Sequence, residues 1–433
     1  MKSFRRIEDY ISTHTYLLLT LIALLAWVIG IAVINATPLK INNGETTTWW
    51  GIALNLIHGY GYSFCNQYYF PFCDVSTPYT AIREPAPVLL FAAVAALFKE
   101  SLLAAALTEL ILHIGIVIAS FYLTREWSSP STGLLAALAW ALYPRAYILI
   151  PQVSGDLLAG LGVTVGIYFV MKARRTDKVR DWLLGGLALG IAVMSRSAML
   201  MVALSLIVGC AVERWSLKKQ ILSWLKPSLL VAVMVGVIMS PWLIYTDLAF
   251  GRPLTGSSLV GYNIFRHNFT VATNDYFHYV DNNEAWAAVQ ALLARRTDLT
   301  HTENEAQMDV VYRQEGLRII AANPVHYVLL SAYRFFMLWF DWQVSVGFGF
   351  PMGPTEYSLA ALQLVLLILA FIGLKNNWRL TWPLWSSLIM VTLAYMAVDS
   401  RMLYTGPVMP LVLSLSAAGV VKLIQKFTTV PSL

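Results

Sequence analysis

Charge is scarce in this sequence. Only 12% of the 433 residues are Asp, Glu, Lys or Arg, whereas 58% are hydrophobic. Soluble domains average about 25% charged residues, so this chain cannot cover a water-facing surface. Cysteine is also rare, with three residues, and the chain shows no internal repeat, low-complexity tract or soluble domain. These shortages exclude an ordinary soluble protein and predict an integral membrane protein.

Common catalytic and cofactor motifs are missing as well. The sequence has no Gly-rich phosphate loop, no Cys/His spacing of a metal site and no serine-nucleophile motif. The net charge of +6 comes from cations in short loops between apolar runs. Such cations indicate membrane topology rather than a nucleic-acid surface, so we expect no nucleic-acid partner.

Long apolar runs dominate what is present. About 20 apolar residues are needed for a helix to cross the hydrocarbon core. The first run lacks the small-residue cleavage site of a signal peptide, so we expect it to remain as an anchor. The pattern predicts an all-α membrane protein with roughly ten spans, within about two. The expected spans are 16–36, 102–123, 132–150, 155–171, 182–194, 198–212, 227–246, 358–374, 382–397 and 406–421.

Lysine and arginine indicate the orientation. Basic residues precede the first run and recur in the loops 172–180 and 214–226. Cytoplasmic loops carry the excess of Lys and Arg, so we place these loops and both termini in the cytoplasm. The protein would then lie in the cytoplasmic (inner) membrane, with a first outer loop at 37–101 and a larger outer segment at 247–326. We expect both outer loops to carry short interfacial helices.

The run 85–98 is too short to span. Its about 14 apolar residues suit a half-inserted segment better than a membrane crossing. If it crossed, the most basic loop, 172–180, would face outward. We therefore expect one polytopic domain over residues 1–433, in which 85–98 is half-inserted and the aromatic stretch 327–346 lies in the interface.

Several charged residues from separate parts of the chain fall on or near the predicted outer face. Charged groups at membrane depth are costly and mark functional sites by default. Each also has a structural explanation: Arg83 and Glu84 could extend along the interface, and Arg196 could mark a helix end. Their gathering on one side predicts an active site at the outer surface. They are Glu45, Arg83, Glu84, Asp156, Arg196, Asp399 and Arg401.

Two histidines leave alternatives open. His267, in the larger outer segment, could aid catalysis, bind a metal or be an ordinary loop residue. Glu109 and His113 are four residues apart and share a helix face. We expect a buried, hydrogen-bonded pair that orients neighbouring helices. A divalent metal stays an open alternative.

The first outer loop carries a recognisable spacing. The acidic Glu45 stands eight positions before Ala53, which is followed by Leu56 and by Gly59 and Gly61. This spacing resembles the first-loop signature of polytopic C-type glycosyltransferases, closest to the protein O-mannosyltransferase-like family and its relatives that add aminoarabinose to lipid A. The family usually has Asp at the acidic position, where this chain has Glu.

Looser matches extend the resemblance over most of the chain. Asp156 stands where the family's second outer loop is acidic, and residues 185–196 follow its G-x-x-x-G-x-x-x-x-x-R hairpin. Arg401 and Tyr404 resemble an R-Y-x-x-P-x-x-P pattern, although here the Arg and Tyr are not adjacent.

The resemblance implies roles for these residues. Glu45 would be the general base, and Asp156 or Glu84 would orient the acceptor or the base. The donor phosphate would be held by arginine and tyrosine side chains, namely Arg83, Arg196, Arg401 and Tyr404, with His267 and Asp399 as auxiliary groups.

Glu45 has a plainer explanation, because an acid at the start of a short helix favours the helix dipole. Trp49 and Trp50, which follow it, are expected to anchor this helix in the interface.

The implied activity is a membrane glycosyltransferase. It would move a sugar from a polyprenyl-phosphate-linked donor to a glycan, lipid or protein acceptor at the outer face, with inversion at the anomeric carbon. Two other classes remain open: a transporter or flippase of lipid-linked sugars, and a non-catalytic lipid-binding membrane subunit. Transporters often show paired repeats, and this chain shows none.

Cys65 and Cys73 both fall in the first outer loop, eight positions apart. An oxidising compartment would favour a disulfide between them, and the alternative is two free thiols. Cys210 lies within an apolar helix and is interpreted as a packing residue.

Overall fold

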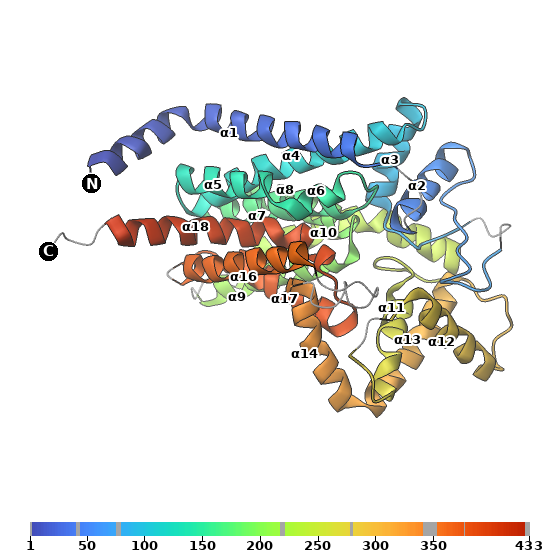
Figure 1. Ribbon diagram of the computed structural model, residues 1–433. Coiled ribbons are helices and arrows are strands. Elements are labelled where there is room, and N and C mark those ends of the chain that lie inside the picture. Colours follow the sequence, from blue (N-terminus) through green and yellow to red (C-terminus); the bar gives the residue numbers. More distant parts are fainter. Residues whose placement is uncertain are drawn as a thin grey trace.

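The chain is a bundle of long helices with smaller helices gathered at one end, as the computed structural model in Figure 1 shows. The backbone is described for residues 2–39, 44–74, 79–216, 221–277, 280–340, 353–375 and 377–428. Side chains are described for the same residues except 2–10, 12, 44–45, 216, 221–224 and 428. These ranges contain helices and no strand, which confirms the predicted all-α membrane fold.

Seven helices in the described ranges are long and apolar enough to cross a membrane. Three shorter helices stand at the other predicted spans: α5 (Pro130–Ala141), α8 (Val179–Val193) and α17 (Trp382–Val398). The predicted span 132–150 is broken, because α6 (Pro144–Leu149) begins at a proline, which cannot continue the hydrogen bonds of a preceding helix. The long helices are α1 (Lys2–Ala36), α4 (Leu102–Trp127), α7 (Asp156–Thr176), α9 (Leu200–Ser216), α10 (Ile221–Phe250), α16 (Pro354–Leu374) and α18 (Met409–Thr428).

Small residues let the central helices approach closely. A Cβ atom on Gly162 of α7 would come within 2.8 Å of the Ala188 carbonyl oxygen on α8. One on Gly186 of α8 would come within 2.8 Å of the Val231 carbonyl oxygen on α10. Lipid tails are as apolar as the helix surfaces, so the hydrophobic effect does not hold membrane helices together. Close van der Waals packing does this instead. These glycines therefore define the contact faces of α7, α8 and α10.

The helices of the two predicted outer loops collect at one end of the bundle. The N-terminal end of α1 and the C-terminal end of α18 lie on the left of Figure 1, and α14 (Pro324–Phe340) slants away from the long helices. The surface helices predicted within 247–326 are present. At the right-hand end lie α2 (Gly44–Ile57), α3 (Pro85–Leu97), α11 (Val260–Arg266), α12 (Asn282–Arg295) and α13 (Glu305–Ala322).

The basic loops lie at the opposite end. Arg175 lies 3.1 Å from a carboxylate oxygen of Glu126, near the C-terminal end of α4. Arg214, near the end of α9, lies 2.7 Å from Asp177, the residue after α7. The long helices thus separate the predicted outer loops from the predicted cytoplasmic loops. Which end faces the cytoplasm stays a prediction.

Both ends of α3 lie at the end of the bundle that carries the outer loops. Ala86, in its first turn, donates a backbone hydrogen bond to the Met194 carbonyl (3.0 Å). Glu100, just after α3, contacts His58 at the end of α2 (2.7 Å). The half-inserted position of this segment stays a prediction.

Candidate functional site

Arg83 connects the start of α3 to the first turns of α2. Its Nε donates a hydrogen bond to Thr48 Oγ1 (2.9 Å), and its guanidinium lies 5.5 Å from the centroid of the Trp49 ring. No hydrogen bond of its two terminal nitrogens occurs within the described residues. A guanidinium held in this way can donate from both terminal nitrogens to an anion.

Position 45 lies in the first turn of α2, one helical turn before Thr48. The side chain of Glu45 lies outside the described residues. The helix nevertheless brings position 45 close in sequence and in space to the residue that orients Arg83.

Trp49 and Trp50 differ from the prediction. Both side chains are buried within the protein, with 0% and 1% exposure, so they do not anchor α2 in the lipid interface. Loop residues pack over α2; Phe64, for example, would lie 2.7 Å from a Cβ atom on Gly51. The sequence shows the aromatic residues but not the loop that covers them.

Glu84, Asp156 and Arg196 meet at the tip of the α8–α9 hairpin. Arg196 Nε donates to Asp156 Oδ1 (2.9 Å), and Nη2 of the same guanidinium pairs with the second carboxylate oxygen. Glu84 accepts a hydrogen bond from the backbone N–H of Ser197 (2.9 Å). Both carboxylates already have protein partners, so in this arrangement they position the hairpin.

Gly155 allows the start of α7 to lie close to the tip of the α8–α9 hairpin. A Cβ atom on Gly155 would lie 2.3 Å from the Ser195 carbonyl oxygen, too close for any other residue without movement of the backbone. The first residue of α7, Asp156, consequently lies beside Arg196.

The expected bond between Glu109 and His113 is absent. Glu109 instead accepts a hydrogen bond from the backbone N–H of Ser154 (3.0 Å), and it thereby supports the turn that leads to Asp156. Both ring nitrogens of His113 are buried and lack a hydrogen-bond partner among the described residues. The ring packs between Trp140 and Tyr147, at centroid distances of 5.6 and 4.9 Å. The spacing of Glu109 and His113 on one helix face correctly predicted that both side chains are buried, but it did not predict the partner of Glu109.

A second cluster surrounds Asp399. Its Oδ2 lies 3.2 Å from His267 Nε2 and accepts a hydrogen bond from the Tyr404 hydroxyl (2.9 Å). Arg401 lies 4.0 Å from the same oxygen. Burial lowers the pKa of His267 to about 3, so the imidazole is neutral near pH 7. A neutral imidazole with its proton on Nε2 can donate to the Asp399 carboxylate.

Tyr395 lies between the two clusters. Its ring stacks on Tyr404, with centroids 5.0 Å apart. It also lies within electrostatic range of Arg196 and Asp156. The predicted residues Glu84, Asp156, Arg196, His267, Asp399, Arg401 and Tyr404 therefore occupy one region, with Arg83 adjoining it through Glu84.

Arg334 of α14 is a component that the sequence reasoning missed. It donates to Asn268 Oδ1 (3.1 Å), to the carbonyl of Met396 (3.3 Å) and to the carbonyl of His267. It therefore joins α14 and the end of α17 to the segment that carries His267. A signal was present, since a single arginine within an aromatic, apolar stretch is a functional candidate by default.

Glu305 was missed for a different reason. It is 6% exposed and accepts hydrogen bonds from Thr80 Oγ1 (2.6 Å), the Ala81 N–H (2.8 Å) and Ser258 Oγ (2.6 Å). Burial raises the pKa of its carboxyl to about 7, although the three donated hydrogen bonds oppose that rise. In the sequence Glu305 looks like any acid at the start of a surface helix.

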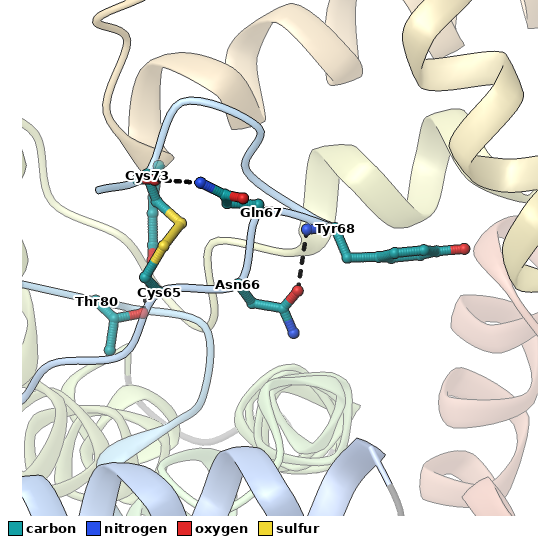
Figure 2. Close-up of a disulfide and its surroundings, with 7 residues drawn as sticks. Cys65, Asn66, Gln67, Tyr68, Cys73 and Thr80 are labelled. Carbon is teal, nitrogen blue, oxygen red and sulfur yellow. Dashed lines mark hydrogen bonds between the residues drawn. A yellow bond between two sulfur atoms is a disulfide. The ribbon is translucent and has the colours of Figure 1, made fainter. Parts of the chain in front are cut away.

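The first outer loop is closed by a disulfide between Cys65 and Cys73, whose Cα atoms are 5.6 Å apart. Figure 2 shows Gln67 reaching toward Cys73 and Asn66 bonded to the backbone of Tyr68. The Tyr68 ring points away from the disulfide and stacks on Trp286 of α12 at 5.6 Å. The disulfide thus belongs to the contact between the first outer loop and the larger outer segment.

A metal centre is not evident within the described residues, where no three His, Cys, Asp or Glu side chains are grouped to hold an ion.

Comparison with known proteins addresses the fold. Residues 83–245 match the family model of dolichyl-phosphate-mannose-protein mannosyltransferases. Sequence comparison with curated proteins gives no match. The oligosaccharyltransferase of Archaeoglobus fulgidus, tethered with an acceptor peptide containing the NVT sequon, is 13% identical with a TM-score of 0.57. That match covers 97% of this chain and 51% of the other.

The chain has the fold of the polytopic C-type glycosyltransferases. The resemblance predicted from the first-loop spacing is confirmed for the fold. A second structure from Archaeoglobus fulgidus, AglB in complex with an inhibitory peptide and a dolichol-phosphate, is 14% identical with a TM-score of 0.52 over 96% of this chain and 51% of that one. The chain therefore spans about half the length of the solved structures that it matches.

A more distant likeness is to ArnT from Cupriavidus metallidurans bound to undecaprenyl phosphate, at 12% identity, with 94% of this chain and 77% of that chain covered. Its TM-score of 0.40 is too low to bear on the fold.

Proposed function

We propose that this membrane protein transfers a sugar from a polyprenyl-phosphate-linked donor to an acceptor at the outer face of the membrane. The observation that carries the proposal is the placement of Arg83. Its guanidinium is oriented by Thr48 and Trp49 and has two terminal nitrogens to offer. Thr48 itself stands one helical turn after the acidic position 45. Glycosyl transfer from a phosphate donor requires a cation to hold the phosphate and a carboxylate to take the acceptor proton.

The proposed step is a single displacement. The Glu45 carboxylate takes the proton from an acceptor hydroxyl, and the acceptor oxygen attacks the anomeric carbon of the donor. The bond from that carbon to the phosphate oxygen breaks, and the polyprenyl phosphate leaves with the electron pair. Configuration at the anomeric carbon inverts, because the attack and the departure occur on opposite faces.

Other residues support this step in the proposal. Arg83 neutralises the charge that develops on the departing phosphate, and Arg401 is a second candidate because its side chain keeps 29% exposure. Asp156 and Glu84 hold the hairpin tip through Arg196 and Ser197, which makes them positioning residues. The relatives support a lipid carrier in general terms, since the AglB structure contains a dolichol-phosphate.

The direct test replaces Glu45 with Gln, which keeps the size of the side chain but cannot accept the proton. Loss of a general base typically slows a reaction about 100- to 10,000-fold. We expect Glu45→Gln to reduce the release of polyprenyl phosphate from a panel of polyprenyl-phosphate sugars by that order, with donor binding retained. A transporter would move the donor without releasing polyprenyl phosphate.

The matched control is Glu100→Gln, at an acid of the same loop that is 44% exposed and paired with His58. It should release polyprenyl phosphate at the wild-type rate. Near-normal turnover by Glu45→Gln, with normal expression and melting temperature, would remove Glu45 from this role.

A further inference from the structure

The segment that leads to Arg83 is held by a set of buried hydrogen bonds. Thr80, Ala81 and Ile82 are each 0% exposed. The Thr80 N–H donates to the Tyr62 carbonyl (3.0 Å), and the Thr80 carbonyl accepts from the Tyr245 hydroxyl (3.1 Å). A buried backbone needs such partners, because an unpaired polar group in the interior loses its hydrogen bonds to water without replacement.

One carboxylate lies at the centre of this set. Glu305 Oε1 accepts from Thr80 Oγ1, and Oε2 accepts from both the Ala81 N–H and Ser258 Oγ. The backbone N–H of Ser258 in turn donates to the Ala81 carbonyl (2.7 Å). Three segments far apart in sequence therefore meet on a single side chain.

The connection continues directly to Arg83. Thr80 Oγ1 also accepts from the Ile82 N–H (3.2 Å), so the residue next to Arg83 is fixed by the same hydroxyl that contacts Glu305. The carbonyl of Arg83 accepts from the Tyr62 hydroxyl (2.9 Å). The backbone on both sides of the Arg83 Cα is therefore held, which fixes where its side chain begins relative to Thr48 and Trp49.

We propose that Glu305 is a positioning residue of the candidate site: its carboxylate clamps segment 80–82 to α13 and to Ser258, and it thereby fixes Arg83 for the donor phosphate. This inference rests on the proposed function, in which Arg83 contacts that phosphate. It assigns to the larger outer segment a part in donor recognition, although α13 itself contributes no residue to the predicted site.

The test uses the full-length protein with Glu305→Gln. The amide keeps one acceptor oxygen but puts an NH₂ group where the second oxygen accepts hydrogen bonds. We expect the apparent KM for the polyprenyl-phosphate donor to rise about tenfold, a change of roughly 1.4 kcal/mol in binding. The apparent KM for the acceptor should not change.

The control is Glu315→Gln on the same helix, at an acid whose partner Arg318 is exposed. It should leave both constants unchanged. Ser258→Ala is a milder second variant that keeps the carboxylate and removes one donor, and it should raise the donor KM in the same direction by a smaller factor.

A double-mutant cycle separates positioning from general destabilisation. If Glu305 acts through Arg83, then Glu305→Gln should cost little more in an Arg83→Lys background, because the oriented guanidinium is already lost. Equal factors in both backgrounds, or an unchanged donor KM in Glu305→Gln and Ser258→Ala, would overturn the inference while the proposed function stands. A wild-type protein that neither binds a short-chain polyprenyl phosphate nor releases it from donors would overturn both.

Discussion

At the scale of single residues, Asp156 and Arg196 form a buried ion pair at the candidate site. Their side chains are 2% and 12% exposed. Taking two charges out of water costs free energy that their attraction repays only when both partners are present. The pair therefore specifies how the hairpin tip meets α7 more than it adds to stability.

Removal of one partner should expose this dependence. We expect Asp156→Asn to destabilise the protein by about 3–5 kcal/mol, since Arg196 then stays buried without its counter-ion. The double variant Asp156→Asn with Arg196→Met should regain part of that loss. The readout is the melting temperature in detergent.

The matched control is Asp298→Asn, which breaks an ion pair whose aspartate is 62% exposed. Its melting temperature should stay near that of the wild type, because exposed pairs contribute little. If Asp156→Asn melts at the same temperature as Asp298→Asn, the pair has no structural role.

At the scale of elements, the first outer loop is docked on the larger outer segment by aromatic side chains. Tyr69 packs against Tyr262 of α11 at 5.1 Å, and its carbonyl accepts from the Tyr312 hydroxyl of α13 (3.0 Å). Both contacts fall within the ring closed by Cys65 and Cys73. The disulfide limits the conformations of the unfolded chain and so favours the docked loop.

We expect mass spectrometry of unreduced protein to show the peptides of Cys65 and Cys73 joined, with Cys210 free. Closing a loop this short should stabilise the protein by roughly 2–3 kcal/mol in the chain-entropy model. The variant Cys65→Ser with Cys73→Ser should therefore melt lower than the wild type. Alkylation of Cys65 and Cys73 without prior reduction would contradict the bridge.

At the scale of the whole molecule, the two ends of the bundle carry different loops. One end carries the candidate site and the disulfide loop, and the other carries the loops with Arg175 and Arg214. Positive loops stay in the cytoplasm, so this polarity predicts that the site faces outward.

Labelling with a membrane-impermeant maleimide tests that orientation, in a background without the native cysteines. We expect Lys99→Cys, after α3, to react from outside in intact cells, and Lys178→Cys to react only after permeabilisation. Both native side chains are exposed, so access to the reagent is matched. The reverse pattern would mean that the orientation is wrong or that α3 crosses the membrane. Labelling of both positions from one side would mean that one of the three predicted spans between them does not cross.

The sequence by itself determined the membrane class, most of the helix positions and the C-type resemblance. These properties depend on local composition: apolar runs must leave water, and Pro144 stands at the start of a new helix, α6. The tertiary structure alone decided which charges are paired and which side chains are buried. Trp49 became an interior residue, Glu109 bonded to Ser154 rather than to His113, and Glu305 became the centre of a buried junction. Burial and pairing depend on contacts between segments far apart in the chain, and no local pattern encodes those contacts.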